Sequence, residues 1–312
     1  MVGGSLMSKQ KHVQHVKDIK SDRNFKIVNY TFLTIAMAVV LYPLIYVLSA
    51  SISDPTAVNS GKMWLWPKDI NFEGYKEIFN HGAIWRGYLN TIFYTVLGTT
   101  ISLAITLPAA YTLGREDFVG RNFFTAVFVL TMFFEGGLIP TYLVVKNLGL
   151  IDTIWALVLP NAAAIWNIVI ARVFFQSTIP KELEESAKID GCSNFKLFFK
   201  IVLPLSAPII AVMALFYGVD QWNNYFDALI YLKDRSLYPL QMVLREILVM
   251  QEMSAQDAGM TEELASSLHS KQELAAVIKY GVMIVSTLPI IIIYPFLQRF
   301  FVQGVMIGSL KG

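Results

Sequence analysis

The sequence predicts an all-α membrane protein that crosses the bilayer about six times. Hydrophobic residues make up 55% of its 312 residues and charged residues only 15%, whereas soluble domains have roughly 45–50% apolar and about 25% charged residues. The apolar runs are long and continuous, unlike the strands of a membrane barrel, which alternate apolar and polar residues over about ten positions. This composition excludes an ordinary soluble enzyme and a disordered chain.

Six runs with few or no charges are long enough to cross the hydrocarbon core, which is about 30 Å thick and requires roughly 20 helical residues. They cover residues 27–50, 87–114, 123–145, 154–175, 203–232 and 277–297. The first run is longer than the apolar region of a signal peptide, which has about 7–15 residues, so we expect it to remain as a membrane span.

The third run contains a predicted helix break. Glu135 is followed by Gly136 and Gly137, and Pro140 comes shortly afterwards. Proline removes a backbone donor and glycine weakens a helix, so we expect the helix to break or kink in this stretch. A carboxylate at the bilayer centre is costly, so Glu135 should face protein or water.

The lysine and arginine residues indicate that both termini are cytoplasmic. In that orientation the cytoplasmic segments hold fifteen of these residues and the outer segments nine, as the positive-inside rule requires. The chain then divides into a cytoplasmic tail (1–26), a membrane domain (27–302) and a cytoplasmic C-terminal tail (303–312). The membrane domain includes a cytoplasmic loop at 178–204 and outer loops at 51–86 and 233–276.

The cytoplasmic loop at 178–204 predicts two short helices. Thr178 can cap the first helix, Pro180 fits its first turn and Gly191 ends it. The second helix is expected to begin at Asn194 and end at Val202. The first helix has an expected apolar edge at Leu183, Ala187 and Ile189. A short helix with such an apolar edge suits a protein partner, but an amphipathic helix that rests on lipid headgroups fits the same pattern.

The fifth run carries a second candidate site. Asp220 lies deep in the run, whereas Asp227 is expected at the outer interface because the run exceeds the length of one span. Aromatic and amide side chains accompany Asp220, namely Tyr217, Trp222, Asn223, Asn224 and Tyr225. Aromatic faces stack on sugar rings while amides and carboxylates bind hydroxyl groups, so this cluster suits a sugar path. Hydrogen bonds between bundled helices explain the same residues equally well.

Several kinds of site are excluded by the sequence. Cys192 is the only cysteine and the four histidines are scattered, so no metal site is expected. The net charge of +2 gives no strong field for nucleic acid. No G-x-x-x-x-G-K-[ST] motif is present, so this chain is not expected to bind a nucleotide or another cofactor. No pair of catalytic residues lies within a span, which favours a transport protein over an enzyme.

The cytoplasmic loop resembles the EAA loop of ABC importer permeases, whose pattern is E-A-A-x3-G-x9-I-x-L-P. The matching residues are Glu185, Ser186, Ala187, Gly191, Ile201, Leu203 and Pro204, with serine where the family usually has alanine. Residues 136–142, 222–229 and 301–312 are similar to the carbohydrate-uptake branch, and in particular to the maltose-permease-like group that carries oligo- and polysaccharides. The resemblance covers nearly the whole chain.

This resemblance implies an oligosaccharide permease of the bacterial plasma membrane, driven by ATP and Mg²⁺ that partner subunits bind. The implied partners are two cytoplasmic ATPases, a second permease that is a different chain, and an extracytoplasmic sugar-binding protein. The loop would seat an ATPase through Glu184, Glu185, Ser186, Ala187, Asp190, Gly191, Ile201, Leu203 and Pro204. In the C-terminal tail, Gln303, Gly304 and Gly308 would contact the ATPases, unless the tail is only a frayed terminus.

Two alternatives stay open at this point. The outer loop 233–276 would enter the sugar cleft of the binding protein by the same resemblance, but an acidic docking loop fits its composition as well. The alternative function is a secondary sugar transporter driven by an ion gradient, with Asp220 and Glu135 as ion sites. Inverted repeats would support that alternative, and none is visible in the sequence.

Overall fold

The computed structural model describes residues 20–252, 276–296 and 298 of the chain. Within these residues all the regular secondary structure is helical, with one isolated bridge between Ser53 and Ile70, so the all-α prediction is confirmed. Three helices are long and apolar enough to cross a membrane, namely α1 (Lys20–Ser51), α4 (Gly82–Gly114) and the last helix, Ala276–Phe296.

Two bent helix pairs supply the remaining apolar length. The first pair is α5 (Arg121–Phe133) with α6 (Leu138–Asn147), bent by 114°, and the second is Asn194–Leu205 with α12 (Ala207–Asn223), bent by 82°. If each pair counts as one span, the described residues cross the bilayer up to five times.

The predicted fourth span is interrupted. Residues 154–175 form the short helix α7 (Trp155–Val158), an irregular stretch, and α8 (Ile165–Thr178), whose 14 residues fall short of the roughly 20 that a span requires. Pro160 lies at the interruption and cannot donate the backbone hydrogen bond that would continue α7. A charge-free run therefore overestimates the length of this helix.

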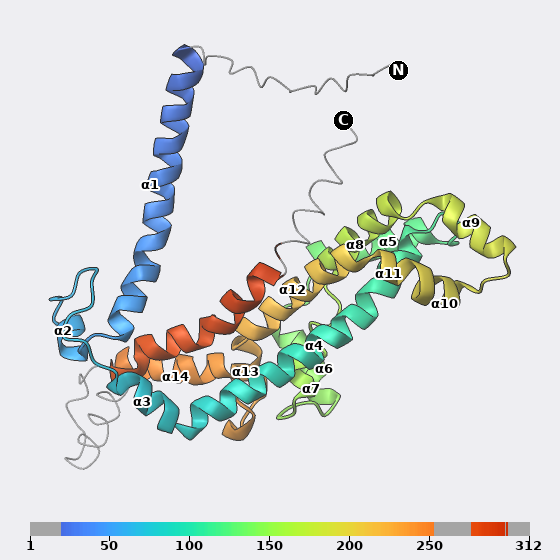
Figure 1. Ribbon diagram of the computed structural model, residues 1–312. Coiled ribbons are helices and arrows are strands. Elements are labelled where there is room, and N and C mark those ends of the chain that lie inside the picture. Colours follow the sequence, from blue (N-terminus) through green and yellow to red (C-terminus); the bar gives the residue numbers. More distant parts are fainter. Residues whose placement is uncertain (1–19, 253–275, 297, 299–312) are drawn as a thin grey trace, which may run out of the picture.

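The long helix α4 is the axis of the molecule. It runs diagonally through the bundle, with α12 and α8 packed along it (Figure 1). The two helices α4 and α12 approach closely because Gly98 leaves room for the side chain of Gln221, which lies 2.9 Å from where a β-carbon would stand. The hydroxyl groups of Thr106 and Tyr217 are 2.6 Å apart across the same contact. Small residues and interhelical hydrogen bonds are the usual means of packing membrane helices.

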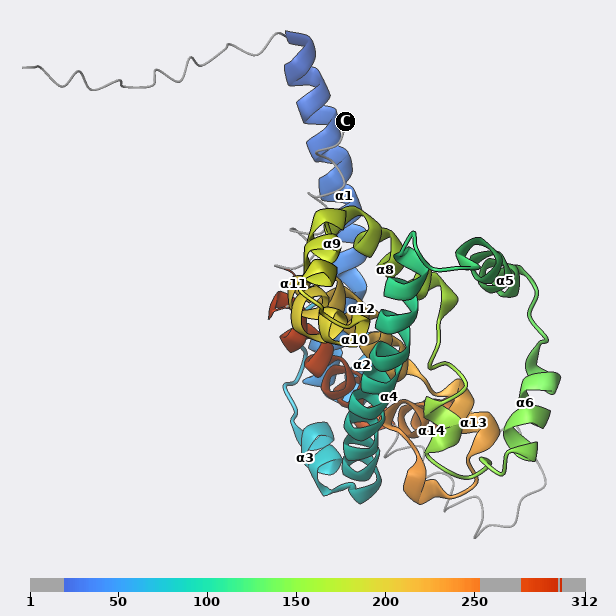
Figure 2. The ribbon, with the colours of Figure 1, turned by 90° about the vertical axis from the view of Figure 1, so that its right-hand side faces the viewer.

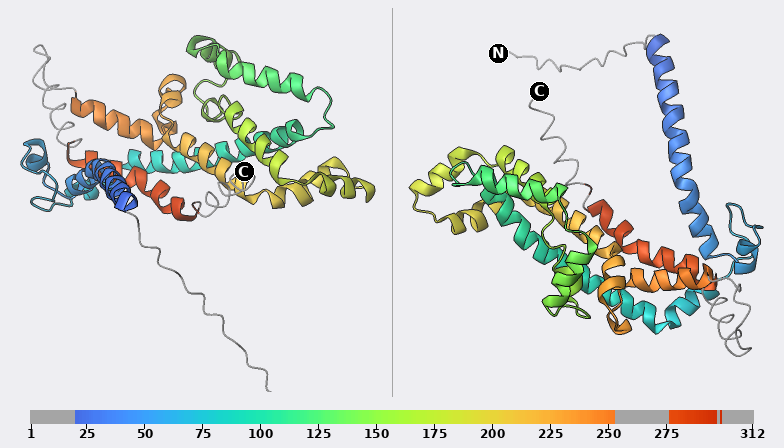
Figure 3. Two further views of the ribbon diagram at one scale, coloured as in Figure 1. Left: turned by 90° about the horizontal axis from the view of Figure 1, so that it is seen from above. Right: turned by 180° about the vertical axis from the view of Figure 1, so that it is seen from behind.

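Helix α1 stands away from this bundle (Figure 3). Its apolar middle is fully exposed in the single chain, and the helix meets the bundle at its C-terminal end. There the rings of Tyr46 and Tyr280 meet edge to face at 6.2 Å, and the Tyr75 hydroxyl donates to the Ser51 hydroxyl at 2.9 Å.

The loops predicted to lie on the outer side come before α4 and after α12. The first loop contains α2 (Pro55–Asn59), capped by the Asp54 side chain, and α3 (Glu73–Asn80). The second begins with α13 (Phe226–Tyr231) and the short turn Arg235–Leu237, and continues with α14 (Leu240–Glu252), which packs on α4. Asp227 lies in α13, beyond the end of α12. The middle of the predicted outer loop 233–276 lies outside the described residues.

Candidate coupling site and translocation groove

The loop predicted to be cytoplasmic folds into a short helix followed by a left-handed glycine. Helix α9 spans Lys181–Ile189, with Pro180 as its N-cap residue and two glutamates in its first turn, where the helix dipole favours negative charge. Thr178 is the last residue of α8 and does not cap α9 as predicted. Gly191 follows with a φ of +71°, and its backbone N–H donates to the carbonyl of Lys188 at 3.0 Å. Only glycine adopts this left-handed conformation without strain, so Gly191 sets the direction in which the chain leaves α9.

The second helix is longer than predicted. The Ser193 side chain accepts a hydrogen bond from the backbone N–H of Lys196 and caps α10 (Asn194–Leu197). A π-helical turn (Phe198–Val202) and α11 (Leu203–Leu205) continue it without interruption, and the chain then bends at Ser206 into α12. Of the three matched residues after the loop, Ile201 lies in the π-helical turn and Leu203 and Pro204 form the start of α11.

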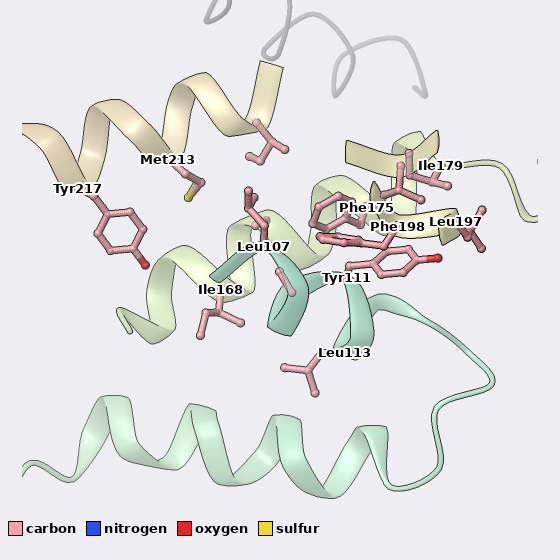
Figure 4. Packing of buried hydrophobic residues seen from close by; sticks show 14 of the residues in the cluster. Leu107, Tyr111, Leu113, Ile168, Phe175, Ile179, Leu197, Phe198, Met213 and Tyr217 are labelled. Atoms are coloured by element: carbon pink, nitrogen blue, oxygen red, sulfur yellow. The ribbon is translucent and has the colours of Figure 1, made fainter. Parts of the chain in front are cut away.

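The two faces of α9 differ sharply. Ala187 is only 7% exposed and packs into a cluster that includes the rings of Tyr111, Phe175 and Phe198 (Figure 4). Ile189 is 86% exposed. Ala187 was expected on an apolar edge open to a partner, but its small side chain instead lets α9 lie against its own bundle. Of the residues predicted to seat an ATPase, Glu185, Ser186, Asp190, Gly191 and Pro204 stay exposed, and so does the neighbouring Ile189.

A charged network joins this loop to the C-terminal end of α4. The guanidinium of Arg115 binds Asp117 through two hydrogen bonds, Nε to Oδ1 at 2.8 Å and Nη2 to Oδ2 at 2.6 Å. The ammonium of Lys188 on α9 reaches the same carboxylate at 2.9 Å. The Tyr111 hydroxyl donates to Glu184 of α9 at 3.0 Å, so Glu184 faces its own chain and is half-buried.

A groove of about 840 Å³ opens on the other part of the bundle, between α8, α12 and the last helix. Asp220 and Asn223 of α12 line it together with Trp166 of α8 and Tyr294 of the last helix. Trp166 is 62% exposed, and Tyr294 is also exposed. Among the described residues, the Asp220 carboxylate makes no hydrogen bond or ion pair. The groove therefore offers open aromatic faces beside an available carboxylate, while the amide N–H of Asn223 donates to the carbonyl of Val219 at 2.8 Å.

The residues of the predicted sugar-path cluster lie in two different surroundings. Asp220, Asn223 and the ring of Tyr217 line the groove, whereas Trp222, Asn224 and Tyr225 do not. Trp222 is buried, donates from its indole N–H to the carbonyl of Ser286 at 2.9 Å and meets the Tyr88 ring edge to face. It therefore holds helices together, which is the alternative that the sequence left open.

Asn224 of the same cluster donates to an oxygen of Asp227 at 2.7 Å. Asn161, which lines the groove, donates to the same oxygen at 2.9 Å. Trp166 and Tyr294 were not predicted from the sequence, because both lie in apolar runs away from the Asp220 cluster. The indole next to an amide at Trp166-Asn167, in the middle of an apolar run, could have indicated Trp166.

The remaining predicted sites are placed as follows. The chain leaves helical geometry between Phe133 and Leu138, where Glu135 and Gly136 are exposed and Gly137 has a φ of +84°. Pro140 lies inside the first turn of α6 rather than at the break. The C-terminal residues Gln303, Gly304 and Gly308 lie outside the described residues. Residues 20–252, 276–296 and 298 contain no group of three or more His, Cys, Asp or Glu residues placed to hold a metal ion.

Comparison with known proteins identifies relatives along the whole chain. Residues 17–307 match the family described as binding-protein-dependent transport system inner membrane component. Two proteins of Bacillus subtilis (strain 168) are similar: Protein LplC, 40% identical over 96% of this chain and 99% of that protein, and the polygalacturonan/rhamnogalacturonan transport system permease protein YtcP, 42% identical over 93% and 99%.

A solved structure agrees with these sequence matches. A chain from the crystal structure of a bacterial ABC transporter that imports the acidic polysaccharide alginate superimposes with a TM-score of 0.80 and 35% identity, over 91% of this chain and 99% of that one. This chain therefore belongs to the family of inner membrane components of binding-protein-dependent transport systems, the permeases of ABC importers.

Proposed function

We propose that this chain is one of two permeases in an ATP-driven importer of oligosaccharides, and that it couples to a cytoplasmic ATPase through α9. The observation that carries the proposal is the exposed face of α9, which is followed by the left-handed Gly191, in the loop predicted to be cytoplasmic. The names of YtcP and of the alginate transporter support a carbohydrate cargo. The comparisons offer no support for a secondary transporter driven by an ion gradient.

The coupling site would act through the exposed residues of the loop. An ATPase that grips Glu185, Ile189 and Asp190 can move α9 as a unit, because the opposite face of the helix is packed against the bundle. Only contacts that differ between two states can drive a conformational change. ATP and Mg²⁺ belong to the two ATPases, and this chain needs no cofactor. The second permease is a different chain, and an extracytoplasmic binding protein delivers the sugar.

The groove would form this chain's half of the translocation path. The rings of Trp166 and Tyr294 can stack on the apolar faces of sugar rings, while Asp220 and Asn223 bind hydroxyl groups. Of the described residues that line the groove, Asp220 is the one with a charge. In this proposal both termini lie on the cytoplasmic side of the membrane.

The test is uptake by the purified complex in proteoliposomes. Labelled oligosaccharides of polygalacturonan, alginate and raffinose type are offered with the cognate binding protein on the outside and ATP on the inside. The proposal expects uptake of at least one of them that depends on internal ATP and persists after ionophores remove the ion gradients. Uptake that ionophores abolish, or a purified complex without an ATPase, would refute it.

A further inference from the structure

We propose that Arg115, Asp117 and Lys188, here called the anchor, are positioning residues that transmit movement of α9 to the long helix α4. This inference rests on the proposed function. It goes beyond it by assigning a role to residues outside the matched loop pattern, two of which lie in the turn after α4.

The anchor joins three elements at one guanidinium. Arg115 follows directly after α4, and its Nη1 donates to Tyr111 of α4 and to Asn194 of α10, both at 3.2 Å. Its Nε and Nη2 hold Asp117, which in turn binds Lys188 of α9. The Arg115 side chain is only 9% exposed, although it lies in a surface turn. Both helices of the coupling loop are therefore fastened to the same end of α4.

The ion pair of Arg115 and Asp117 persists around neutral pH. Hydrogen bonding to Arg115, followed by that to Lys188, holds the pKa of the Asp117 carboxyl well below its usual range. The hydrogen bond to Asp117 in turn raises the pKa of Arg115. A carboxyl with a lowered pKa keeps its pairing above its ordinary pKa and loses it only when the pH falls through the lowered value. The anchor is therefore a permanent fastening rather than a pH switch.

Helix α4 connects the anchor to the groove. It is one continuous helix of 33 residues, and α12 packs along it. Thr106 of α4 lies two turns before the anchor, and its hydroxyl is 2.6 Å from that of Tyr217, whose ring lines the groove. A displacement of α9 that is passed to Arg115 thus reaches the groove through a packed helix and a direct hydrogen bond (Figure 2 shows α9 at one end of α4). Without the anchor, movement of α9 would reach α4 less completely, through the Tyr111–Glu184 hydrogen bond, the exposed Lys181–Glu116 pair and the packing of Ala187.

The chain offers a matched control for the anchor. Lys181 and Glu116 also join α9 to the turn after α4, with an N–O distance of 2.6 Å. Their side chains are 69% and 66% exposed, and exposed ion pairs of this kind contribute little. Removing this pair takes away one lysine charge and one carboxylate charge between α9 and the turn after α4. The guanidinium of Arg115 stays in place.

The experiment compares the sugar imported per ATP hydrolysed in the full complex, reconstituted in proteoliposomes. The test variants are Arg115→Gln, Asp117→Asn and Lys188→Met, and the control variants are Lys181→Met and Glu116→Gln. We expect the ratio to fall roughly tenfold in the first two test variants, the factor that corresponds to one lost charge-assisted hydrogen bond. The fall should be smaller in Lys188→Met, because Asp117 keeps Arg115. The ratio should stay at the wild-type value in both controls, and the ATPase should remain bound in every variant.

Two further variants keep the test decisive. If Arg115→Gln yields no complex, Arg115→Lys takes its place in the test. Lysine retains the charge but cannot bind Asp117, Tyr111 and Asn194 together. We therefore expect the sugar imported per ATP hydrolysed to be intermediate. The double variant Asp117→Asn, Lys188→Met should be no worse than Asp117→Asn alone, because the two changes break one contact. A wild-type ratio in the anchor variants would overturn the inference, and so would release of the ATPase, which would make the anchor a docking element. Failure of the wild-type complex to use ATP would instead refute the proposed function.

Discussion

The coupling loop and the translocation groove use polar residues in opposite ways. In the coupling region, the charges of Arg115, Asp117 and Lys188 bind one another, and apolar Ile189 is left exposed. In the groove, the carboxylate of Asp220 is left open, and the neighbouring aromatic rings of Trp166 and Tyr294 are exposed as well. Under the proposed function, the surface that transmits force is internally bonded, and the surface that lets cargo pass keeps a carboxylate available.

The largest effect is expected when the turn after α9 is deformed. Gly191→Val places a β-branched residue at a φ of +71°, where L residues are disfavoured by roughly 1–2 kcal/mol even before branching is considered. We expect uptake to be lost while the ATPase still hydrolyses ATP, as measured in proteoliposomes. Gly191→Asn should recover part of the uptake, because asparagine tolerates this conformation.

A matched glycine serves as the control. Gly82 also has open space around its missing β-carbon but no positive φ, so Gly82→Ala should transport normally. Normal coupled transport by Gly191→Val would show that the direction of the turn after α9 is unimportant.

Overfilling the inner face of α9 should have the next largest effect. Ala187 is buried against the Tyr111 cluster, and overpacking a close-packed core costs about 1–3 kcal/mol. Ala187→Leu should therefore lower the thermal stability of the complex and weaken coupling, as read from its melting temperature and its uptake per ATP. An unchanged melting temperature would mean that the inner face of α9 is not packed as described.

The groove is tested by truncating its open groups. Asp220→Asn should reduce the rate of uptake by roughly tenfold, for the loss of one charged hydrogen bond. Trp166→Ala should also reduce it, because the aromatic face that stacks on a sugar ring is lost. Neither change should alter the ATPase content of the purified complex, because both residues are remote from α9. Trp222→Phe should lower stability with little effect on the apparent affinity for sugar, since Trp222 donates to Ser286 inside the bundle. The reverse pattern would place the sugar path on the other side of α12.

The smallest effect is expected at Ser186. Its hydroxyl donates to the carbonyl of Glu182 one turn earlier in the same helix, at 2.8 Å, and the side chain is exposed. Ser186→Ala introduces the residue that the family pattern usually has, so stability should change by no more than about 0.5 kcal/mol. Uptake that differs clearly from the wild type would give the serine a role of its own.

The coupling region was the more predictable of the two because its signals are local. Pro180, the early glutamates and Gly191 specify a short helix within one stretch of sequence, and the structure contains that helix. The sequence could not show which face of α9 is buried, because the partners of Ala187 come from α4, α8 and α10–α11. The anchor was also invisible, since Arg115 and Lys188 lie far apart in the chain.

The groove could not be assembled from sequence because its residues come from three separate helices. The neighbours of Asp220 in the chain, such as Trp222, point to the other side of α12, while Trp166 and Tyr294 reach the groove from elsewhere. The predicted spans differ from the observed helices for a related reason. A charge-free run gives the length of an apolar segment, but Pro160 and the bend at Ser206 decide how much of that segment is one straight helix.

Photo-crosslinking from position 189 tests the central claim most directly. A photoreactive amino acid replaces Ile189, the most exposed apolar residue of α9, and the intact complex is irradiated in its native membrane. The account predicts a crosslink to a separate subunit that hydrolyses ATP. The yield of this crosslink should fall when the ATPase is trapped in a different state of its hydrolysis cycle. Crosslinking to lipid alone would mean that α9 rests on the bilayer, and the proposed coupling would be wrong.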